Sequence, residues 1–384
     1  MNKVEESFFA LLRAGLWEKE VRLMQYEKLD FNELLRLADE QSVIGLVAAG
    51  LEHVVDVKVS QMDFLPFVGI ACQLEPLNTS MNDFINVLIK KMQAAGIQTL
   101  LVKGQGIAQC YERPLWRACG DIDLFLSDDN YVKAKNLLIP LATTVEQEGV
   151  YNKHLGLTIG SWVVELHGSL RCGLSSRIDK VLDKIKDDVF RDGNVRSWKN
   201  GETQVFLLNA NDDTIYVFTH ILNHFYKEGI GIRQICDWCR LLWTYKDDID
   251  RKLLEHRLRK MGIMTEWKAF GTFAVEYLGM PIEAMPLLDV RGKDQRPTAE
   301  GQVKNEVKWK KKAEMIRVFV MEVGNMGHNR DSGYKKYPYV IKKFFSMERR
   351  IGDLYRHARI FPLDSVRFLP KIVFNGLRSA MRGE

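Results

Sequence analysis

The spacing of apolar residues changes along the chain, and the change predicts a fold that contains both helices and strands. Apolar positions recur at three-and-four spacing in 8–23 and 31–49, which is typical of helices. Asn78-Thr79-Ser80 is a predicted cap before a helix over 81–95, which ends at Gly96. Four more helices are predicted towards the C-terminal half, at about 211–227, 232–246, 250–261 and 264–278.

Between these helical regions, short apolar segments predict strands. Strands are expected at 97–102 and 121–126, and a hairpin is expected to join 154–159 to 162–167 through Gly160-Ser161. Helices at about 105–112 and 129–139 follow the first two strands, and the segments 192–194 and 199–201 resemble linkers.

These elements predict an α+β fold, in which a small mixed β-sheet core is flanked by N-terminal and C-terminal helical regions. A length of 384 residues predicts two or three domains. We expect four regions, at 1–95, 96–200, 201–300 and 301–384.

Two aspartates fall on one face of the predicted strand 121–126. Side chains alternate between faces in a strand, so Asp121 and Asp123 point together while Ile122 and Leu124 point into the core. Neighbouring carboxylates repel each other unless a cation lies between them, and their oxygens suit Mg²⁺. The pattern therefore predicts either a metal site or an edge strand with two solvated aspartates.

The segment before this strand carries a possible phosphate site. Lys103-Gly104-Gln105-Gly106 follows an apolar strand and precedes a helix, and such a turn leaves backbone N–H groups free to bind phosphate. The Lys103 side chain adds a positive charge. Arg117, four residues before Asp121, is expected either to reach the same phosphates or to lie in an exposed loop.

A third acidic residue occurs in the strand 162–167. Val163, Glu165 and His167 share one face of this strand, opposite Trp162, Val164 and Leu166. A polar residue in so apolar a strand costs free energy unless it is paired or coordinated. Glu165 is therefore a candidate third metal ligand and a candidate proton acceptor, and the alternative is an exposed glutamate on the sheet face.

The order of these features resembles the DNA polymerase β-like nucleotidyltransferase superfamily, and most closely its branch of uncharacterised nucleotidyltransferases. That signature is a Gly-Ser on a strand-to-helix turn, an Asp-x-Asp on the next strand, and an acidic residue on a later strand. Gly104, Asp121 with Asp123, and Glu165 occupy these places, within about residues 90–170.

The resemblance continues more faintly over about 205–245, where His220, His224, Arg233 and Asp237 resemble the helical region of that branch. Gln105 departs from the pattern, because serine normally follows the glycine. The interval from the glycine to the aspartates is also longer than in the polymerase signature. These departures put the usual hydroxyl contact to the triphosphate, and the identity of the nucleotide, in question more than the metal site.

The resemblance implies attack by an acceptor hydroxyl on the α-phosphorus of a nucleoside triphosphate (NTP), with release of pyrophosphate. It assigns two Mg²⁺ ions to Asp121, Asp123 and Glu165. It assigns the leaving phosphates to Lys103, Gly104, Gln105 and Arg117. Replacing either aspartate by asparagine should then remove activity and leave the fold nearly intact, because both aspartates are expected at the water-facing mouth of the site.

Two further pairs of residues have the spacing of metal ligands. His220 and His224 are one helical turn apart, and we expect them to face the catalytic cleft or to pack with hydrogen bonds, with zinc as the alternative. Cys236 and Cys239 lie in an apolar, helix-like segment, and buried thiols are favoured there over zinc or redox chemistry.

Length and composition agree with a soluble intracellular enzyme. No apolar run approaches the ~18 residues that span a bilayer, and the first six residues lack the features of a signal peptide. The six cysteines are scattered, which fits reduced thiols better than a disulfide framework. We expect a cytoplasmic protein with no transmembrane segment.

Charge is unevenly distributed along the chain. Residues 301–384 contain 19 Lys and Arg against 8 Asp and Glu, a net charge of +11, whereas the whole chain has +5. Basic clusters at 308–312, 335–336, 342–343 and 349–350, and an apolar-basic segment at 366–381, predict contact with an anionic membrane or nucleic acid. The alternative is a solvated helical face packed on the domain by its apolar side.

The sequence thus favours a Mg²⁺-dependent nucleotidyltransferase that acts on an unknown hydroxyl acceptor, which is a small molecule, a saccharide or a protein. The main alternative is a catalytically silent nucleotide- or RNA-binding module with the same fold.

Overall fold

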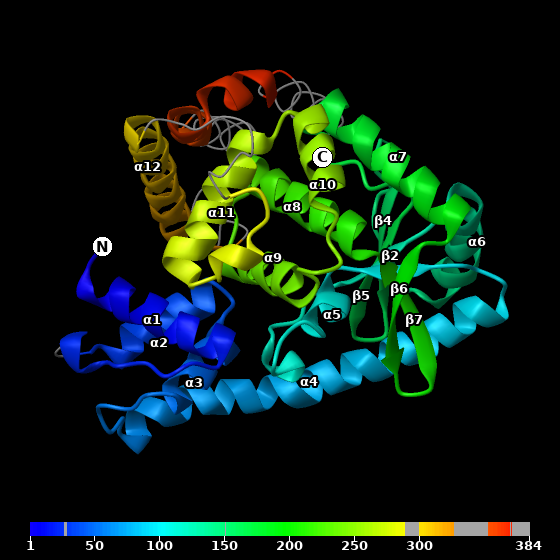
Figure 1. The fold of residues 1–384 in the computed structure, drawn as a ribbon. Helices are drawn as coiled ribbons and strands as arrows, with labels where there is room; N and C mark the ends of the chain where they lie inside the picture. Colours follow the sequence, from blue (N-terminus) through cyan, green and yellow to red (C-terminus); the bar gives the residue numbers. More distant parts are fainter. Residues whose placement is uncertain (27–28, 150, 289–298, 326–351, 369, 371–384) are drawn as a thin grey trace, which may run out of the picture.

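The computed structural model describes residues 1–26, 29–149, 151–288, 299–325, 352–368 and 370. In this part of the chain, one seven-stranded mixed sheet is flanked by helices from both ends of the sequence (Figure 1). This arrangement confirms the predicted α+β class.

The N-terminal region consists of α1 (Lys3–Trp17), the 3₁₀ turn η1 (Met24–Tyr26), α2 (Phe31–Glu40), α3 (Ile44–Glu52) and α4 (Gln61–Ala94). The single helix predicted over 31–49 is wrong, because the chain turns between α2 and α3 at Ser42, whose φ is +56°. The helix α4 is 34 residues long and extends along the lower edge of the molecule to the sheet (Figure 1).

The predicted helix start at Asn78-Thr79-Ser80 is also wrong. Ser60 caps α4 instead, and the helix continues through this segment, where the Asn78 side chain bonds to the loop before β2 and does not cap a helix. The Asn78 amide donates to the backbone oxygens of Leu115 and Arg117 at 2.8 and 2.9 Å. These tertiary contacts outweigh the local preference of Asn and Ser for helix ends.

The sheet has the order β3-β4-β5-β2-β1-β7-β6. The pairs β2/β5 and β1/β7 are parallel and the others are antiparallel. The strands are β1 (Leu100–Val102), β2 (Ile122–Phe125), β3 (Thr144–Val145), β4 (His154–Ile159), β5 (Trp162–His167), β6 (Val195–Asn200) and β7 (Thr203–Leu208). The hairpin predicted over 154–159 and 162–167 is confirmed residue for residue.

The remaining helices connect or cover these strands. Those within the sheet region are α5 (Gly104–Ala108), η2 (Pro114–Trp116), α6 (Asp128–Leu138), η3 (Ile139–Leu141) and α7 (Ser176–Asp192). Those that follow are α8 (Ala210–Lys227), α9 (Ile232–Thr244), α10 (Arg251–Met261), α11 (Met264–Leu278), η4 (Ile282–Ala284) and α12 (Ala299–Val323). Residues 352–360 and 362–368 are also helical. The four helices predicted from 211 onwards are confirmed to within about two residues.

The linker interpretation of 192–194 and 199–201 is wrong. Gly193, with φ +66°, ends α7, and Gly201, with φ +60°, lies in the turn between β6 and β7. The sheet therefore continues past residue 200, where the sequence suggested a boundary between regions.

The two faces of the sheet pack against different helices. Ile122, Leu124, Val164 and Leu166 belong to a cluster with apolar residues of α4 and α6. Phe125 instead belongs to the cluster formed with α7 and the helices that follow it. Alternation along β2 therefore places Asp121 and Asp123 on the face of α7 to α9, as the sequence predicted for the two sides of this strand.

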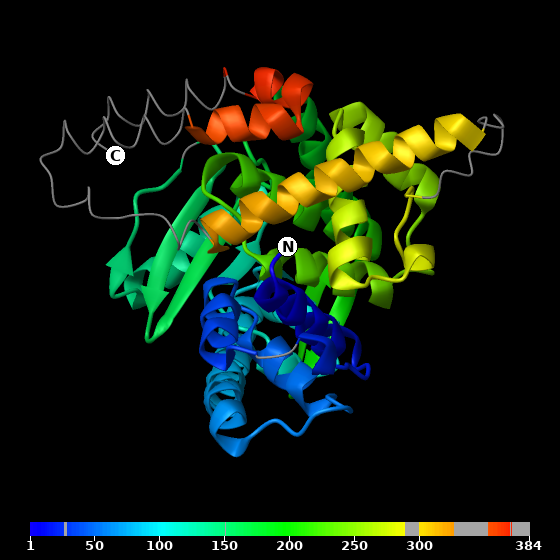
Figure 2. The ribbon, with the colours of Figure 1, turned by 90° about the vertical axis from the view of Figure 1, so that its left-hand side faces the viewer.

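The helical core is continuous between the N-terminal and C-terminal regions. The Trp17 indole donates to Leu278 O at 2.6 Å, and Phe9 packs edge-on against Phe273 of α11. Figure 2 shows α12 and the helices of 352–368 together above the N-terminal helices. Among the described residues, no helix is long and apolar enough to cross a membrane.

Part of the basic C-terminal region is described. Lys310 pairs with Glu306 and Glu276, and Lys312 donates to Ile360 O, so the cluster 308–312 is partly engaged within the protein. The clusters at 335–336, 342–343 and 349–350, and most of the segment 366–381, lie outside the described residues.

A buried carboxyl group in α11 leads to a prediction about pH. Burial raises the pKa of Glu266 to about 8, and Asp364 adds to the rise. In the unfolded chain this group ionises near pH 4.5. Between pH 4.5 and pH 8 the folded state therefore binds more protons than the unfolded state, so the free energy of unfolding falls as pH rises. We expect the free energy of unfolding to drop by about 3 kcal/mol more between pH 5 and pH 8 in the wild type than in Glu266→Gln, measured by urea denaturation. Equal pH slopes for the two proteins would contradict this assignment.

Candidate active site

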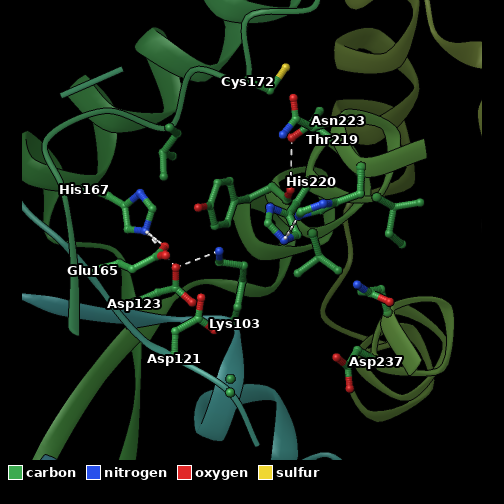
Figure 3. A pocket seen from close by; sticks show the side chains of 18 of the residues that line it. Lys103, Asp121, Asp123, Glu165, His167, Cys172, Thr219, His220, Asn223 and Asp237 are labelled. Atoms are coloured by element: carbon green, nitrogen blue, oxygen red, sulfur yellow. Dashed lines mark hydrogen bonds and ion pairs between the residues drawn. The ribbon is translucent and has the colours of Figure 1, made fainter. Parts of the chain in front are cut away.

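Three acidic side chains converge on one face of the sheet, at the strands β2 and β5. The two strands are parallel, and Asp123 is paired directly with Glu165. Asp121 lies on the same side just before β2. Carboxylate oxygens of Asp121, Asp123 and Glu165 lie within 4.8 Å of one another (Figure 3). The structure thus brings together the three residues that the sequence selected.

Lys103 follows β1 and points at these carboxylates. Its Nζ lies 2.7 Å from Asp123 Oδ1 (Figure 3). Its backbone has φ +58° and ψ −147°, a conformation used almost only by glycine, so the position carries strain of about 1–3 kcal/mol. Although burial opposes the charged form, Asp123, Tyr216, Asp121 and Glu165 raise the pKa of Lys103. The side chain is therefore a fixed cation in the site.

Asp123 is the most enclosed of the three carboxylates. It is only 2% exposed, and His167 Nε2 donates to the same Oδ1 atom at 2.7 Å. The expectation that both aspartates lie at a water-facing mouth is therefore wrong for Asp123, because β1 and β5 enclose it on both sides. Asp121 reaches solvent at the mouth of the cavity, and the charge of Asp123, with partial desolvation by the surrounding cavity, raises the pKa of Asp121.

Glu165 is held by two histidines. His154 Nε2 and His167 Nε2 lie 3.0 and 3.3 Å from Glu165 Oε2. Burial opposes ionisation of Glu165, but the hydrogen bonds from His154 and His167 lower its pKa far below the usual range. Burial also opposes the charged form of His167, and hydrogen bonds to Asp123 and Glu165 raise its pKa. These hydrogen bonds hold Glu165 in its charged form, which a metal ligand requires.

Arg117 neither lies in an exposed loop nor points freely towards a ligand. It is 6% exposed, and its Nε and Nη2 donate to the two carboxylate oxygens of Asp237 in α9, each at 2.8 Å. The Tyr111 hydroxyl also donates to Asp237, at 2.7 Å. Arg117 borders the cavity, but its side chain connects the loop before β2 to α9.

The Gln105 side chain is directed away from the acidic residues. It is 2% exposed, and its Nε2 donates to Asn78 Oδ1 of α4 at 2.5 Å. Gln105 therefore packs behind the turn and does not line the cavity. Gly104, with φ +43°, lines the cavity beside Lys103.

The acidic residues open into a cavity of about 440 Å³. Residues of α8 and α9 form its other side, including Tyr216, Asn223, Lys227 and Arg233. The Arg233 Nη1 donates to Ala118 O at 3.0 Å, and among the described residues no carboxylate forms an ion pair with its guanidinium. The cavity therefore combines an acidic end with basic groups on the opposite wall.

The two pairs with metal-ligand spacing differ in environment. His220 and His224 line the cavity, with their Nε2 atoms 3.0 Å apart, and His224 Nδ1 lies 3.0 Å from Glu228 Oε2. Burial and the charge of Lys103 lower the pKa of His220 well below its usual value. The first alternative for these histidines, a place in the cleft with hydrogen bonds, is confirmed.

Cys236 and Cys239 are fully buried free thiols, as predicted. Burial raises the pKa of both thiols. They are therefore suited to packing in α9 rather than to redox chemistry.

His154 is a site residue that was not predicted from the sequence, although the signal was available. The predicted hairpin has a two-residue turn, and this register places His154 directly opposite His167. Tyr216, Asn223 and Lys227 were also missed, and they line the cavity because α8 forms part of its wall. Nothing in their local sequence indicates that position.

The donor set fits divalent cations. Three carboxylates from adjacent strands line the cavity and offer hard oxygen ligands within 4.8 Å of one another. The negative charge of Asp123 raises the pKa of Asp121. A cation bound between the two carboxylates would offset this repulsion.

The site is a cavity with three carboxylates at one end and basic side chains on the opposite wall. The model of a family described as uncharacterised nucleotidyltransferase matches residues 27–279, which include every residue that lines the cavity. The chain belongs to this family. Membership supports nucleotidyl transfer as the activity and implies an NTP substrate. Searches of curated proteins and of solved structures gave no significant match.

Proposed function

We propose that this protein is a Mg²⁺-dependent nucleotidyltransferase of the DNA polymerase β-like superfamily. It transfers a nucleoside monophosphate from an NTP to an acceptor hydroxyl. The new bond joins the acceptor oxygen to the α-phosphorus, the bond from the α-phosphorus to the bridging oxygen breaks, and pyrophosphate leaves. The hydroxyl loses its proton as the new bond forms.

One observation carries this proposal. Asp121, Asp123 and Glu165 converge from two parallel strands beside a buried, positively charged Lys103. Three carboxylates against one lysine leave excess negative charge beside the cavity, which favours a bound divalent cation over a purely structural role.

The chain supplies binding and orientation. Asp121, Asp123 and Glu165 would hold two Mg²⁺ ions, which when bound neutralise phosphate charge and stabilise the attacking and leaving oxygens. Lys103 and the backbone at Gly104 face the same space and would bind the leaving phosphates. Because Arg117 is paired with Asp237, we assign it to positioning α9 rather than to phosphate contact. Arg233 is the better-placed arginine for an anionic group, since it lines the cavity without a carboxylate partner among the described residues.

The acceptor would enter from the side of α8 and α9. This wall of the cavity offers hydrogen-bonding groups of Asn223, Lys227 and Gln234, which suit a polar, hydroxyl-bearing acceptor. A small molecule, a saccharide and a protein hydroxyl all satisfy this chemistry. The basic C-terminal region is a candidate surface for an anionic partner.

The activity is tested with the full-length protein, Mg²⁺ and each NTP in turn, labelled at the α-phosphate, against small-molecule, saccharide and protein acceptors. We expect pyrophosphate release that requires Mg²⁺, with the label transferred to one class of acceptor. Mass spectrometry of the acceptor checks the gain of one nucleoside monophosphate.

The same experiment separates the rival function. A silent binding module would bind nucleotide or RNA with an affinity that depends on salt, would release no pyrophosphate, and would be unaffected by Asp121→Asn. That combination of results would contradict the proposed activity.

A further inference from the structure

A second group of metal-ligating side chains lies beside the acidic cluster. His154 and His167 stand opposite each other across the β4/β5 hairpin, and both rings face Glu165. The centroids of the two rings are 4.9 Å apart. One ligand atom from each of the three residues lies within 4.8 Å of the other two. This cluster comprises two imidazoles and one carboxylate.

The distances in this cluster resemble those between ligands that share one ion. Glu165 Oε2 lies 3.0 Å from His154 Nε2 and 3.3 Å from His167 Nε2. Ligands at about 2.0–2.1 Å from a tetrahedral zinc ion are about 3.3 Å apart. The side chains thus need little movement to bind one ion.

The chemistry of the donors selects the class of ion. Imidazole nitrogens favour Zn²⁺, Co²⁺ and related transition ions, whereas Mg²⁺ prefers oxygen ligands. Asp121 and Asp123, on the other side of Glu165, offer only oxygen. Glu165 belongs to both groups and therefore joins a nitrogen-rich position to an oxygen-rich one.

We propose that His154, Glu165 and His167 form a binding site for a divalent transition metal ion, next to the oxygen-ligand site of Asp121 and Asp123. The side chains of His154 and Glu165 are 25% and 22% exposed, so an ion can enter from the cavity and keep an open position. On binding, His167 exchanges its hydrogen bonds to Asp123 and Glu165 for a bond to the ion. This site does not depend on the proposed nucleotidyl transfer, because binding of the ion is measured without nucleotide.

The test is titration of the metal-free, full-length protein with Co²⁺, followed by visible absorption. We expect one equivalent of Co²⁺ to bind with the intense visible bands of a four- or five-coordinate ion, and Zn²⁺ to displace it. His154→Ala and His154→Gln should each weaken binding by at least about 100-fold and remove these bands, since both lose a direct ligand. Circular dichroism checks that each variant is folded.

A matched control is available in the N-terminal region. His53 Nε2 also contacts a carboxylate, Glu18 Oε2 at 2.5 Å, but this pair does not line the cavity. His53→Ala should leave the Co²⁺ bands and the affinity unchanged. Absence of the bands in the wild type, or bands that persist in both His154 variants, would overturn the proposed site.

Failure of the transition metal site and failure of the proposed nucleotidyl transfer give different results. Asp121→Asn should keep the Co²⁺ bands, because Asp121 is not a member of the histidine cluster, even as it abolishes nucleotidyl transfer. A wild type that shows the bands and transfers no nucleotide contradicts the enzyme activity alone. Transfer without the bands contradicts the transition metal site alone.

Discussion

Asp121→Asn is expected to lower the rate of nucleotidyl transfer by about 10³-fold and to leave the protein folded. The substitution keeps the size of the side chain and removes one negative charge from the cluster of three carboxylates. Asp121 is exposed, and among the described residues no cation forms an ion pair with it, so its loss leaves no buried charge unpaired. Removal of its repulsion with Asp123 further favours the folded state.

The measurement is pyrophosphate release by wild type and variant at saturating Mg²⁺, with the free energy of unfolding determined for both. Asp129→Asn is the matched control, because Asp129 is exposed in the first turn of α6 and outside the cavity. Transfer by Asp121→Asn within tenfold of the wild-type rate would contradict a metal-binding role. Asp123→Asn is the less informative substitution, because Lys103 would lose its buried counter-charge and stability would fall together with activity.

Asp237→Ala is expected to destabilise the protein by about 3–5 kcal/mol. Asp237 and Arg117 are both buried and form two parallel hydrogen bonds. Burial opposes ionisation of Asp237, and Arg117 lowers its pKa, so the carboxylate is charged and its removal leaves the guanidinium without a counter-charge. The Tyr111 hydroxyl also loses its acceptor.

Urea denaturation of the single and double variants checks this result. In the double variant Arg117→Met with Asp237→Leu, no unpaired charge remains, and we expect at least half of the lost stability to return. A cost below about 1 kcal/mol for Asp237→Ala would show that Arg117 is adequately solvated without its partner, and would contradict the structural role assigned to the pair.

The sequence predicted the part of the site that local periodicity controls. In a strand the side chains alternate, so the shared face of Asp121 and Asp123, and that of Glu165 and His167, followed from spacing alone. The hairpin over 154–159 and 162–167 was predicted in full, because its strands and its Gly160-Ser161 turn are all local signals.

Elements governed by distant contacts were predicted less well. The start of α4 was placed at 81 rather than at Gln61, because burial of Asn78 against the loop before β2 outweighs its capping preference. The segments 192–194 and 199–201 resembled linkers, since glycine and asparagine occur equally in helix ends and hairpin turns. The helix α7 and the β6/β7 hairpin were missed as a result.

The sequence by itself determined the fold class, the strand that carries the two aspartates and the face on which they lie, because these depend on backbone periodicity. Only the tertiary structure decided which distant groups meet them. The parallel pairing of β2 with β5 brings Glu165 to Asp123. The packing of α9 pairs Arg117 with Asp237, whereas Arg233 lines the cavity without a carboxylate partner among the described residues. The reason is physical: pairing of buried charges is set by which strands and helices pack together, and one strand's spacing contains no information about its neighbours.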